Sequence, residues 1–94
     1  MQQAYYDVAI IGAGVSGCAI ARELSRLDVR TCVIEAEDDV CCGTSRANSA
    51  IVHAGFDAQP GTLMAHLNVE GTSLMPDLCQ ELDVDFSAIG SLVV

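Results

Sequence analysis

The hydrophobic pattern of the first third of the chain changes its period twice. Residues 6–11 form a short run in which half of the side chains are β-branched, which is typical of a buried parallel strand. From residue 15 to about residue 27, apolar residues recur at helical spacing, with arginine and glutamate on the opposite side. Residues 29–35 read VRTCVIE and predict a second strand. This order predicts one β-α-β unit over residues 1–35.

The pattern is less regular after residue 35. Residues 36–48 are polar and predict a loop, whereas residues 49–55 (SAIVHAG) predict a short strand. A long helix is expected over about residues 61–83, where leucines recur along one side and Pro76 is expected to kink or interrupt the helix. Residues 89–94 (IGSLVV) predict the start of a further strand.

Together these elements predict an α/β fold with a Rossmann-like β-α-β core of the kind that binds FAD or NAD(P). A doubly wound sheet contains about five or six parallel strands. Only two of the predicted strands of this chain fit such a sheet. The chain also stops within its last predicted strand, which we interpret as the start of a strand of a substrate domain. We therefore expect residues 1–94 to be the N-terminal fragment of a larger nucleotide-binding protein.

The composition fits a small globular domain and argues against several classes of partner. Of the 94 residues, 51% are hydrophobic, and the formal net charge is −9. The four basic residues are all arginines, so the chain lacks the basic face that a nucleic acid or an anionic membrane requires. The absence of lysine also excludes a P-loop of the kinase type.

The cysteines and the N-terminal flank indicate a cytoplasmic protein. The five cysteines have no regular spacing and no C-x-x-C pair, so neither a disulfide framework nor a metal site is expected. Cys41 and Cys42 are interpreted as packing or loop residues. Residues 1–7 carry no positive charge, unlike the start of a signal peptide, and the apolar run over residues 8–21 is too short to span a bilayer. We expect no transmembrane segment in this portion.

A glycine-rich segment, GAGVSG, matches the pattern G-x-G-x-x-G immediately after the first predicted strand. Its first glycine would permit a tight turn, its second would let the backbone approach a pyrophosphate, and its third would let the helix pack closely on the sheet. Phosphates would then meet the free N–H groups and the positive end of the helix. The candidate nucleotide-binding residues of this turn are Gly12, Ala13, Gly14, Val15, Ser16 and Gly17.

An acidic residue closes the second predicted strand at the spacing that a dinucleotide site requires. Glu35 lies roughly 20 residues beyond the glycines, where a carboxylate accepts hydrogen bonds from the ribose hydroxyls of an adenosine. It would also repel a 2′-phosphate, which disfavours NADP. Ala36 follows Glu35 as a further candidate. The alternative is a glycine-rich turn without a ligand and a solvated glutamate at a strand end.

The glycine pattern serves both NAD and FAD, and the segment after Glu35 distinguishes them by resemblance. YDVAIIGAGVSGCAIARELSRLDVRTCVIEAEDDVCCGTSRANSAIVHAG resembles the start of FAD-dependent oxidoreductases of the D-amino-acid oxidase superfamily. The nearer resemblance is to its glycerol-3-phosphate dehydrogenase and L-2-hydroxyglutarate oxidase branch. It implies FAD as cofactor and residues 36–55 as a loop that contacts the flavin side. It also implies four cofactor contacts, namely Thr44, Ser45, Asn48 and Ser49. The alternative is an ordinary polar loop in which Ser45 caps a short helix.

The same resemblance places His53, within IVHAG, beside the flavin. A neutral histidine there could accept the proton of a substrate hydroxyl while hydride passes to the flavin. The alternatives are a histidine that orders the flavin loop, packs in the core or bonds the flavin covalently. His66 is interpreted as a structural or surface residue.

The resemblance implies an enzyme that oxidises a small acidic hydroxy metabolite, of the glycerol 3-phosphate or 2-hydroxy acid type. Its partners would be that anionic substrate and an electron acceptor, which is a quinone, another carrier or oxygen. Ala47, Ala50 and Met64 depart from the residues common in the branch and leave the exact substrate open. Three alternatives stay open: an amino-acid or amine oxidase of the same superfamily, an NAD-dependent dehydrogenase, and a non-catalytic nucleotide-binding module.

Overall fold

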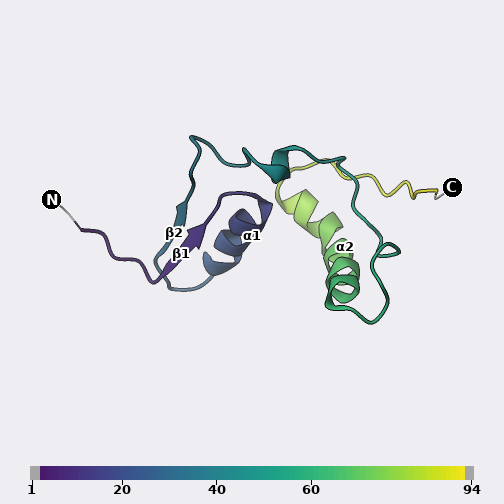
Figure 1. Cartoon of the computed structure of the whole chain (residues 1–94), viewed down its shortest axis with the longest axis horizontal. Helices are drawn as coiled ribbons and strands as arrows, with labels where there is room; N and C mark the ends of the chain where they lie inside the picture. Colours follow the sequence, from purple (N-terminus) through teal and green to yellow (C-terminus); the bar gives the residue numbers. More distant parts are fainter. Residues whose placement is uncertain (1–2, 93–94) are drawn as a thin grey trace. The chain divides into compact units, whose positions relative to one another are not determined.

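A computed structural model describes residues 3–92 of the chain. The elements follow the order β1 (Val8–Ile11), α1 (Val15–Leu24), β2 (Thr31–Ile34), a short 3-10 helix η1 (Thr44–Arg46) and α2 (Leu63–Glu81) (Figure 1). The chain divides into two compact units, Met1–Ala50 and Ile51–Val94. The first unit holds both strands, and the second holds the long helix.

The first unit is the predicted β-α-β unit. Strands β1 and β2 pair in parallel, with Val8 opposite Thr31 and Ile11 opposite Ile34. Each strand begins two residues later than predicted, because the residues before it make hydrogen bonds that do not continue the ladder. The N–H groups of Asp7 and Val8 share the carbonyl of Arg30, while the N–H group of Arg30 donates to the Asp7 carboxylate at 2.8 Å.

Helix α1 ends three residues before the predicted boundary at residue 27. Ser25 is its C-cap, and the Ser25 hydroxyl donates to the carbonyl of Arg22 at 2.6 Å. The next two N–H groups reach back only three residues, from Arg26 to Glu23 and from Leu27 to Leu24. These tighter bonds end the helix in turn geometry, a common form of helix terminus.

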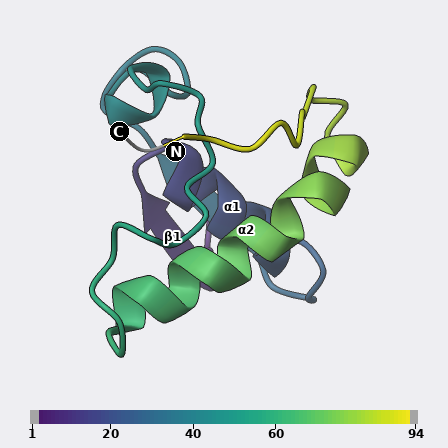
Figure 2. The same ribbon diagram turned by 90° about the vertical axis from the view of Figure 1, so that its right-hand side faces the viewer.

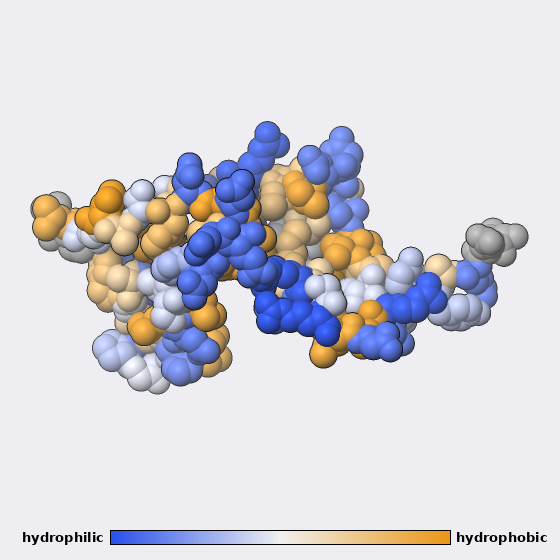
Figure 3. Space-filling view, turned by 180° about the vertical axis from the view of Figure 1, so that it is seen from behind, coloured by the Kyte–Doolittle hydropathy of each residue, from blue (hydrophilic) through white to orange (hydrophobic). Residues whose placement is uncertain are grey.

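Few side chains of the described residues are buried. Ile10 and Ala13 form the small core of the first unit, and Cys79 is the buried hydrophobic residue of the second. Large apolar side chains lie on the surface instead, among them Ile11 and Ile34 at the ends of the two strands. Figure 3 shows many such hydrophobic residues, in orange, at the surface. The sheet therefore positions the glycine turn with little core around it.

In the second unit, α2 runs unbroken through Pro76 (Figure 2). The Thr62 hydroxyl oxygen caps its start by accepting from the N–H group of Ala65 at 3.2 Å. Its end has the two hydrogen bonds of a Schellman motif, from Val84 to Cys79 and from Asp83 to Gln80. The prediction was that Pro76 would kink or interrupt the helix, and interruption is wrong because α2 continues through Pro76 to Glu81. The helix therefore accommodates the loss of one backbone hydrogen bond.

Two predicted strands are not formed. Residues 49–55 are irregular because Ala50 and Gly55 adopt positive φ angles of 59° and 113°, and the segment has no partner strand among the described residues. Residues 89–92 are also irregular, and Gly90 has a φ of 75°. The remainder of that prediction, residues 93–94, lies outside the described residues. Within the described range, no helix is long and apolar enough to cross a membrane.

Candidate functional site

The glycine turn between β1 and α1 has the close approaches that its pattern predicts. Gly12 has a φ of 101°, a conformation that favours glycine. A Cβ atom on Gly17 would overlap the carbonyl oxygen of Gly12 and lie 3.3 Å from Cγ2 of Ile10. A Cβ atom on Gly14 would lie 3.0 Å from the Ser45 hydroxyl oxygen. Glycine at the last two positions thus lets the helix sit on the strand and lets the following loop approach the turn.

Glu35 folds back over this turn. Its Oε1 atom accepts a hydrogen bond from the N–H group of Ala13 at 2.8 Å, and its Oε2 atom accepts one from Glu37 at 2.9 Å. The bond from Ala13, then that from Glu37, holds the pKa of the Glu35 carboxyl below its ordinary value of 4.5. Each carboxylate oxygen has a second lone-pair site. The ionised group can therefore accept further hydrogen bonds from a ligand.

Ser45 connects the polar loop to the start of α1. Its hydroxyl oxygen accepts a hydrogen bond from the N–H group of Val15 at 2.8 Å. Ser45 therefore bonds the first N–H group of α1, whereas the short helix η1 has Gly43 as its N-cap and no side-chain cap. The oxygen is already an acceptor, so its own O–H group remains a donor. The Ser45 hydroxyl thus lies at the N-terminus of α1 as a hydrogen-bond donor.

Two further contacts hold the loop in place. Cys41, at a φ of 57°, donates its backbone N–H group to the carbonyl of Ala13 at 2.9 Å. The Asn48 side chain folds locally, since its Nδ2 atom donates to the carbonyl of Ser45 at 2.8 Å and its Oδ1 atom accepts from Ala50 at 2.7 Å. Ala13 is thereby bonded through both its N–H group and its carbonyl.

These contacts enclose a cavity of about 410 Å³, within the size range of small-molecule sites. Its lining combines five predicted site residues with three others: Gly14, Glu35, Ala36, Thr44, Ser45, and Glu37, Cys42 and Gly43. The remaining predicted residues of this unit do not line it: Gly12, Ala13, Val15, Ser16, Gly17, Asn48 and Ser49. Glu37 and Gly43 directly neighbour predicted residues in the sequence, which is the signal that could have identified them, whereas Cys42 does not.

The residues around the cavity fit the adenosine diphosphate part of a dinucleotide. The first N–H groups of a helix lack intrahelical partners. In α1, Val15 donates to Ser45 and Cys18 to Gly14, so among the described residues Ser16 and Gly17 retain free N–H groups. An anion at this end would meet these donors and the positive end of the helix. The Glu35 carboxylate supplies acceptors for ribose hydroxyls at the same cavity.

His53 lies in the second unit and is held there by both its backbone and its side chain. Its carbonyl accepts hydrogen bonds from Asn68 Nδ2 at 2.8 Å and from Thr72 Oγ1 at 2.5 Å. Its Nδ1 atom lies 3.7 Å from the Asp57 carboxylate. The side chain is 56% exposed among the described residues. The sequence interpretation missed Asn68, Thr72 and Asp57.

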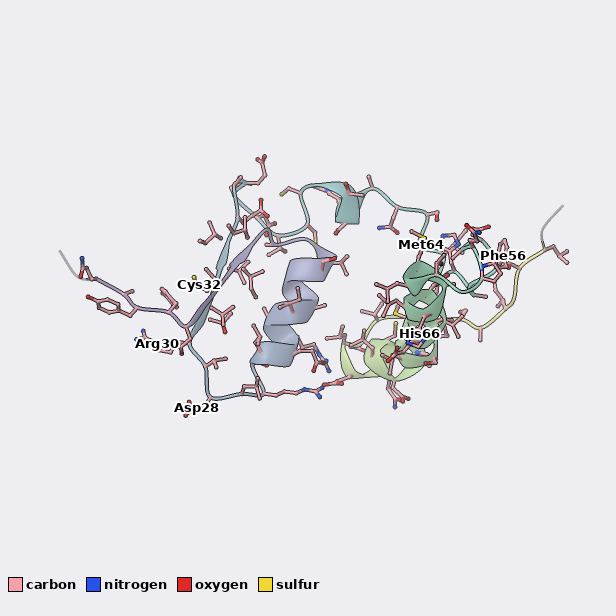
Figure 4. The ribbon with its side chains drawn as sticks, turned by 60° about the horizontal axis from the view of Figure 1, so that its bottom comes forward. Asp28, Arg30, Cys32, Phe56, Met64 and His66 are labelled. Carbon is pink, nitrogen blue, oxygen red and sulfur yellow. The ribbon has the colours of Figure 1, made fainter. Side chains whose placement is uncertain are left out.

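The other histidine is a surface residue of α2. His66 is 72% exposed, and its Nε2 atom lies 3.3 Å from the carboxylate of Glu70. Figure 4 labels His66 and Met64, which both lie on α2. Figure 4 also labels Arg30, whose guanidinium lies over the Tyr6 ring at 5.6 Å, in the first unit. The described residues contain no group of His, Cys, Asp and Glu side chains suited to a metal ion.

Comparison with known proteins identifies the class of this chain. Residues 7–94 match the model of the family described as DAO, FAD dependent oxidoreductase. The chain belongs to this family, and the resemblance deduced from the sequence is confirmed. Its cofactor is therefore FAD, as expected from the segment after Glu35.

Individual relatives share most of this chain. A glycerol 3-phosphate dehydrogenase of Caloramator mitchellensis is 56% identical over 89 residues, which is 95% of this chain and 18% of the relative. A mitochondrial L-2-hydroxyglutarate dehydrogenase of Dictyostelium discoideum is 36% identical over 91 residues, 95% of this chain and 20% of the relative. A glycerol 3-phosphate oxidase of Mycoplasma genitalium is 35% identical over 89 residues, 94% of this chain and 23% of the relative. The chain thus spans about a fifth of the length of the curated relatives it matches.

Proposed function

We propose that this chain is the nucleotide-binding start of an enzyme that oxidises the hydroxyl group of a small anionic metabolite. The observation that carries this proposal is the joint position of Gly14, Glu35 and Ser45 around one cavity at the N-terminus of α1. Family membership gives FAD as the cofactor, and this cavity would hold its adenosine diphosphate part. FAD, when bound, supplies the acceptor for the electron pair of the substrate C–H bond.

The residues of the first unit would bind and orient the adenosine diphosphate end. Glu35 would accept hydrogen bonds from the ribose hydroxyls, since its bonds to Ala13 and Glu37 fix the carboxylate and leave lone pairs free. The free N–H groups of the first turn of α1 would bind phosphate oxygens. Ser45 would donate its O–H group to the same phosphates. We also propose Thr44, Asn48 and Ser49 as contacts toward the flavin side.

In the second unit, His53 would accept a proton from the substrate hydroxyl at its imidazole. The exposed imidazole is suited to this role because one of its ring nitrogens can accept a proton. The substrate class is supported by the relatives, two of which are named for glycerol 3-phosphate and one for L-2-hydroxyglutarate. The greater identity to the glycerol 3-phosphate dehydrogenase favours glycerol 3-phosphate, with a 2-hydroxy acid as the second candidate.

The test is anaerobic stopped-flow mixing of the full-length protein with each candidate substrate while the flavin absorbance is followed. We expect glycerol 3-phosphate to bleach the flavin, and L-2-hydroxyglutarate to do so more slowly or not at all. Reoxidation by a quinone analogue, a dye or oxygen then identifies the electron acceptor. Bleaching by D-amino acids or NADH alone would contradict the proposed substrate class. The cytoplasmic location and the domain boundaries remain predictions.

A further inference from the structure

We propose that Asp57, Asn68 and Thr72 are positioning residues that fix His53 for proton transfer. This inference rests on the proposed function, in which His53 accepts the substrate proton. All four residues lie within the second unit, and three contacts join them. Two of the contacts hold the backbone of His53, and the third places a carboxylate beside its imidazole.

The backbone of His53 is held by one face of α2. Asn68 and Thr72 are four residues apart, which places them one above the other on the same side of a helix. Asn68 Nδ2 donates to the His53 carbonyl, which has two lone pairs. The single proton of the Thr72 hydroxyl is within reach of the carbonyls of Asn68, at 2.9 Å, and His53, and the contact to His53 is the shorter. These side-chain bonds take the place of the strand pairing that residues 49–55 lack. The segment carrying His53 is therefore fixed on the helix without a β-ladder.

Close packing beside His53 supports the same attachment. Gly55 has a φ of 113°, and a Cβ atom there would lie 2.7 Å from Cγ2 of Val69. Val69 directly follows Asn68 on α2. The loop therefore approaches the helix closely at the position where the two hydrogen bonds form. Such an approach restricts the path of the backbone on the C-terminal side of His53.

Asp57 lies on the Nδ1 side of the imidazole. Its Oδ2 atom is 3.7 Å from Nδ1, which is beyond hydrogen-bond distance, so its negative charge would favour the tautomer that carries its proton on Nδ1. In that tautomer Nε2 is the acceptor. The pair His66–Glu70 has the same spacing of four residues, but its carboxylate faces Nε2. The His66–Glu70 pair, which lies inside α2, is therefore a matched control in which the carboxylate faces the other ring nitrogen.

The proton and electron balance of the step is complete with these groups and the bound cofactor. The O–H proton of the substrate passes to Nε2 of His53. FAD, when bound, would supply the two-electron acceptor for the hydride of the hydroxyl-bearing carbon, whose C–O bond would become C=O. The imidazolium that results is stabilised by the carboxylate of Asp57.

The test compares isosteric variants in the full-length protein. Asp57→Asn removes the charge that orients the ring, and Thr72→Val removes a donor to the His53 carbonyl. Matched controls are Glu70→Gln, which alters the His66 pair, and Ser73→Ala, whose hydroxyl donates locally to the carbonyl of Glu70 at 2.6 Å. Thr72→Ser keeps the hydroxyl donor and should rescue Thr72→Val.

We expect Asp57→Asn to slow flavin reduction by glycerol 3-phosphate on the order of tenfold or more, with substrate affinity changed less than about twofold. His53→Asn should slow it roughly 100-fold or more, and adding Asp57→Asn should cause no further loss. Nitrogen-15 spectra of the histidine-labelled protein without substrate should show the Nδ1–H tautomer of His53. Asp57→Asn should shift His53 toward Nε2–H while His66 keeps its spectrum.

The outcomes separate the two proposals. If His53→Asn leaves flavin reduction unchanged, the catalytic role of His53 fails, while the spectra still decide whether Asp57 sets its tautomer. Asp57→Asn and Thr72→Val that behave like Glu70→Gln and Ser73→Ala in both measurements would overturn the positioning role. Independent, additive losses from Asp57→Asn and His53→Asn would overturn it as well. If Thr72→Val does not fold, rescue by Thr72→Ser and the spectra of Asp57→Asn decide the question.

Discussion

The replacement of Gly17 by alanine tests the glycine turn most sharply. Alanine is the best helix former, and at an unhindered position it stabilises a helix relative to glycine by about 0.5–1 kcal/mol. In α1 the added Cβ atom would overlap the carbonyl oxygen of Gly12 and lie 3.1 Å from its carbonyl carbon. Backbone atoms cannot swing away as a side chain can. The helix must therefore move away from the turn.

The magnitude follows from the two opposing terms. Overpacking that forces a backbone shift costs about 1–3 kcal/mol and exceeds the helix-propensity gain. Gly71 is the matched control, because it lies within α2 and a Cβ atom there would meet nothing within 4 Å. Gly71→Ala keeps the gain and has no clash. The gain is common to both variants, so their free energies of unfolding should differ by the overpacking cost of about 1–3 kcal/mol.

Urea unfolding of the full-length variants measures the difference, and the absorbance of released flavin measures bound FAD. We expect Gly17→Ala to unfold at a lower urea concentration and to lose FAD, because the N–H groups of Ser16 and residue 17 move with the helix. Gly71→Ala should be at least as stable as the parent and retain FAD. A Gly17→Ala variant as stable and as rich in FAD as Gly71→Ala would refute this reasoning.

Three further predictions concern the bonds around the cavity. The folded-state pKa of Glu35 lies below 4.5, so its stabilising effect should be fully present above about pH 4.5 and be lost as the pH falls through the folded-state pKa. Glu35→Gln should therefore reduce the fall of the urea midpoint at acid pH, and an unchanged fall would contradict this prediction. Cys41→Gly should raise the free energy of unfolding in urea by about 1 kcal/mol, because glycine adopts the positive φ of 57° without steric strain. Cys42→Gly is the control and should give no such gain, and equal effects of the two variants would argue against backbone strain at Cys41. Gly14→Ala should weaken FAD binding less in the Ser45→Ala background than in the parent, because the 3.0 Å contact between the new Cβ atom and the Ser45 hydroxyl oxygen disappears. Strictly additive losses of FAD affinity in a titration would exclude this contact as the cause of the weaker binding.

The parts of the fold that were predicted from the sequence depend on local pattern. The change of hydrophobic period predicts β1, α1 and β2. The G-x-G-x-x-G pattern and the acidic residue about 20 positions after it predict Gly17 and Glu35, because a bound dinucleotide requires both at this spacing. The FAD prediction also held, because the residues after Glu35 resemble one family throughout. Element ends were less accurate, since they depend on individual capping bonds such as that of Ser25.

The errors and omissions concern contacts between distant residues. Residues 49–55 have a strand-like composition, but a strand needs a partner, and His53 bonds to the side chains of α2 instead. The bond from Val15 to Ser45 joins residues 30 positions apart, which no periodicity reports. Asn68 and Thr72 look like ordinary polar residues of a helix until the loop is placed beside them. Contacts of this kind require the three-dimensional structure.

The central claim is that the first unit binds the adenosine diphosphate part of FAD through Glu35 and the glycine turn. Its most direct test is titration of the flavin-free full-length protein with FAD and with FMN, which lacks the adenosine monophosphate portion. We predict that FAD binds at least about 100-fold more tightly than FMN, equivalent to about 2.7 kcal/mol, and that Glu35→Gln narrows this preference. Equal affinities for FAD and FMN, or a preference unaffected by Glu35→Gln, would contradict the account.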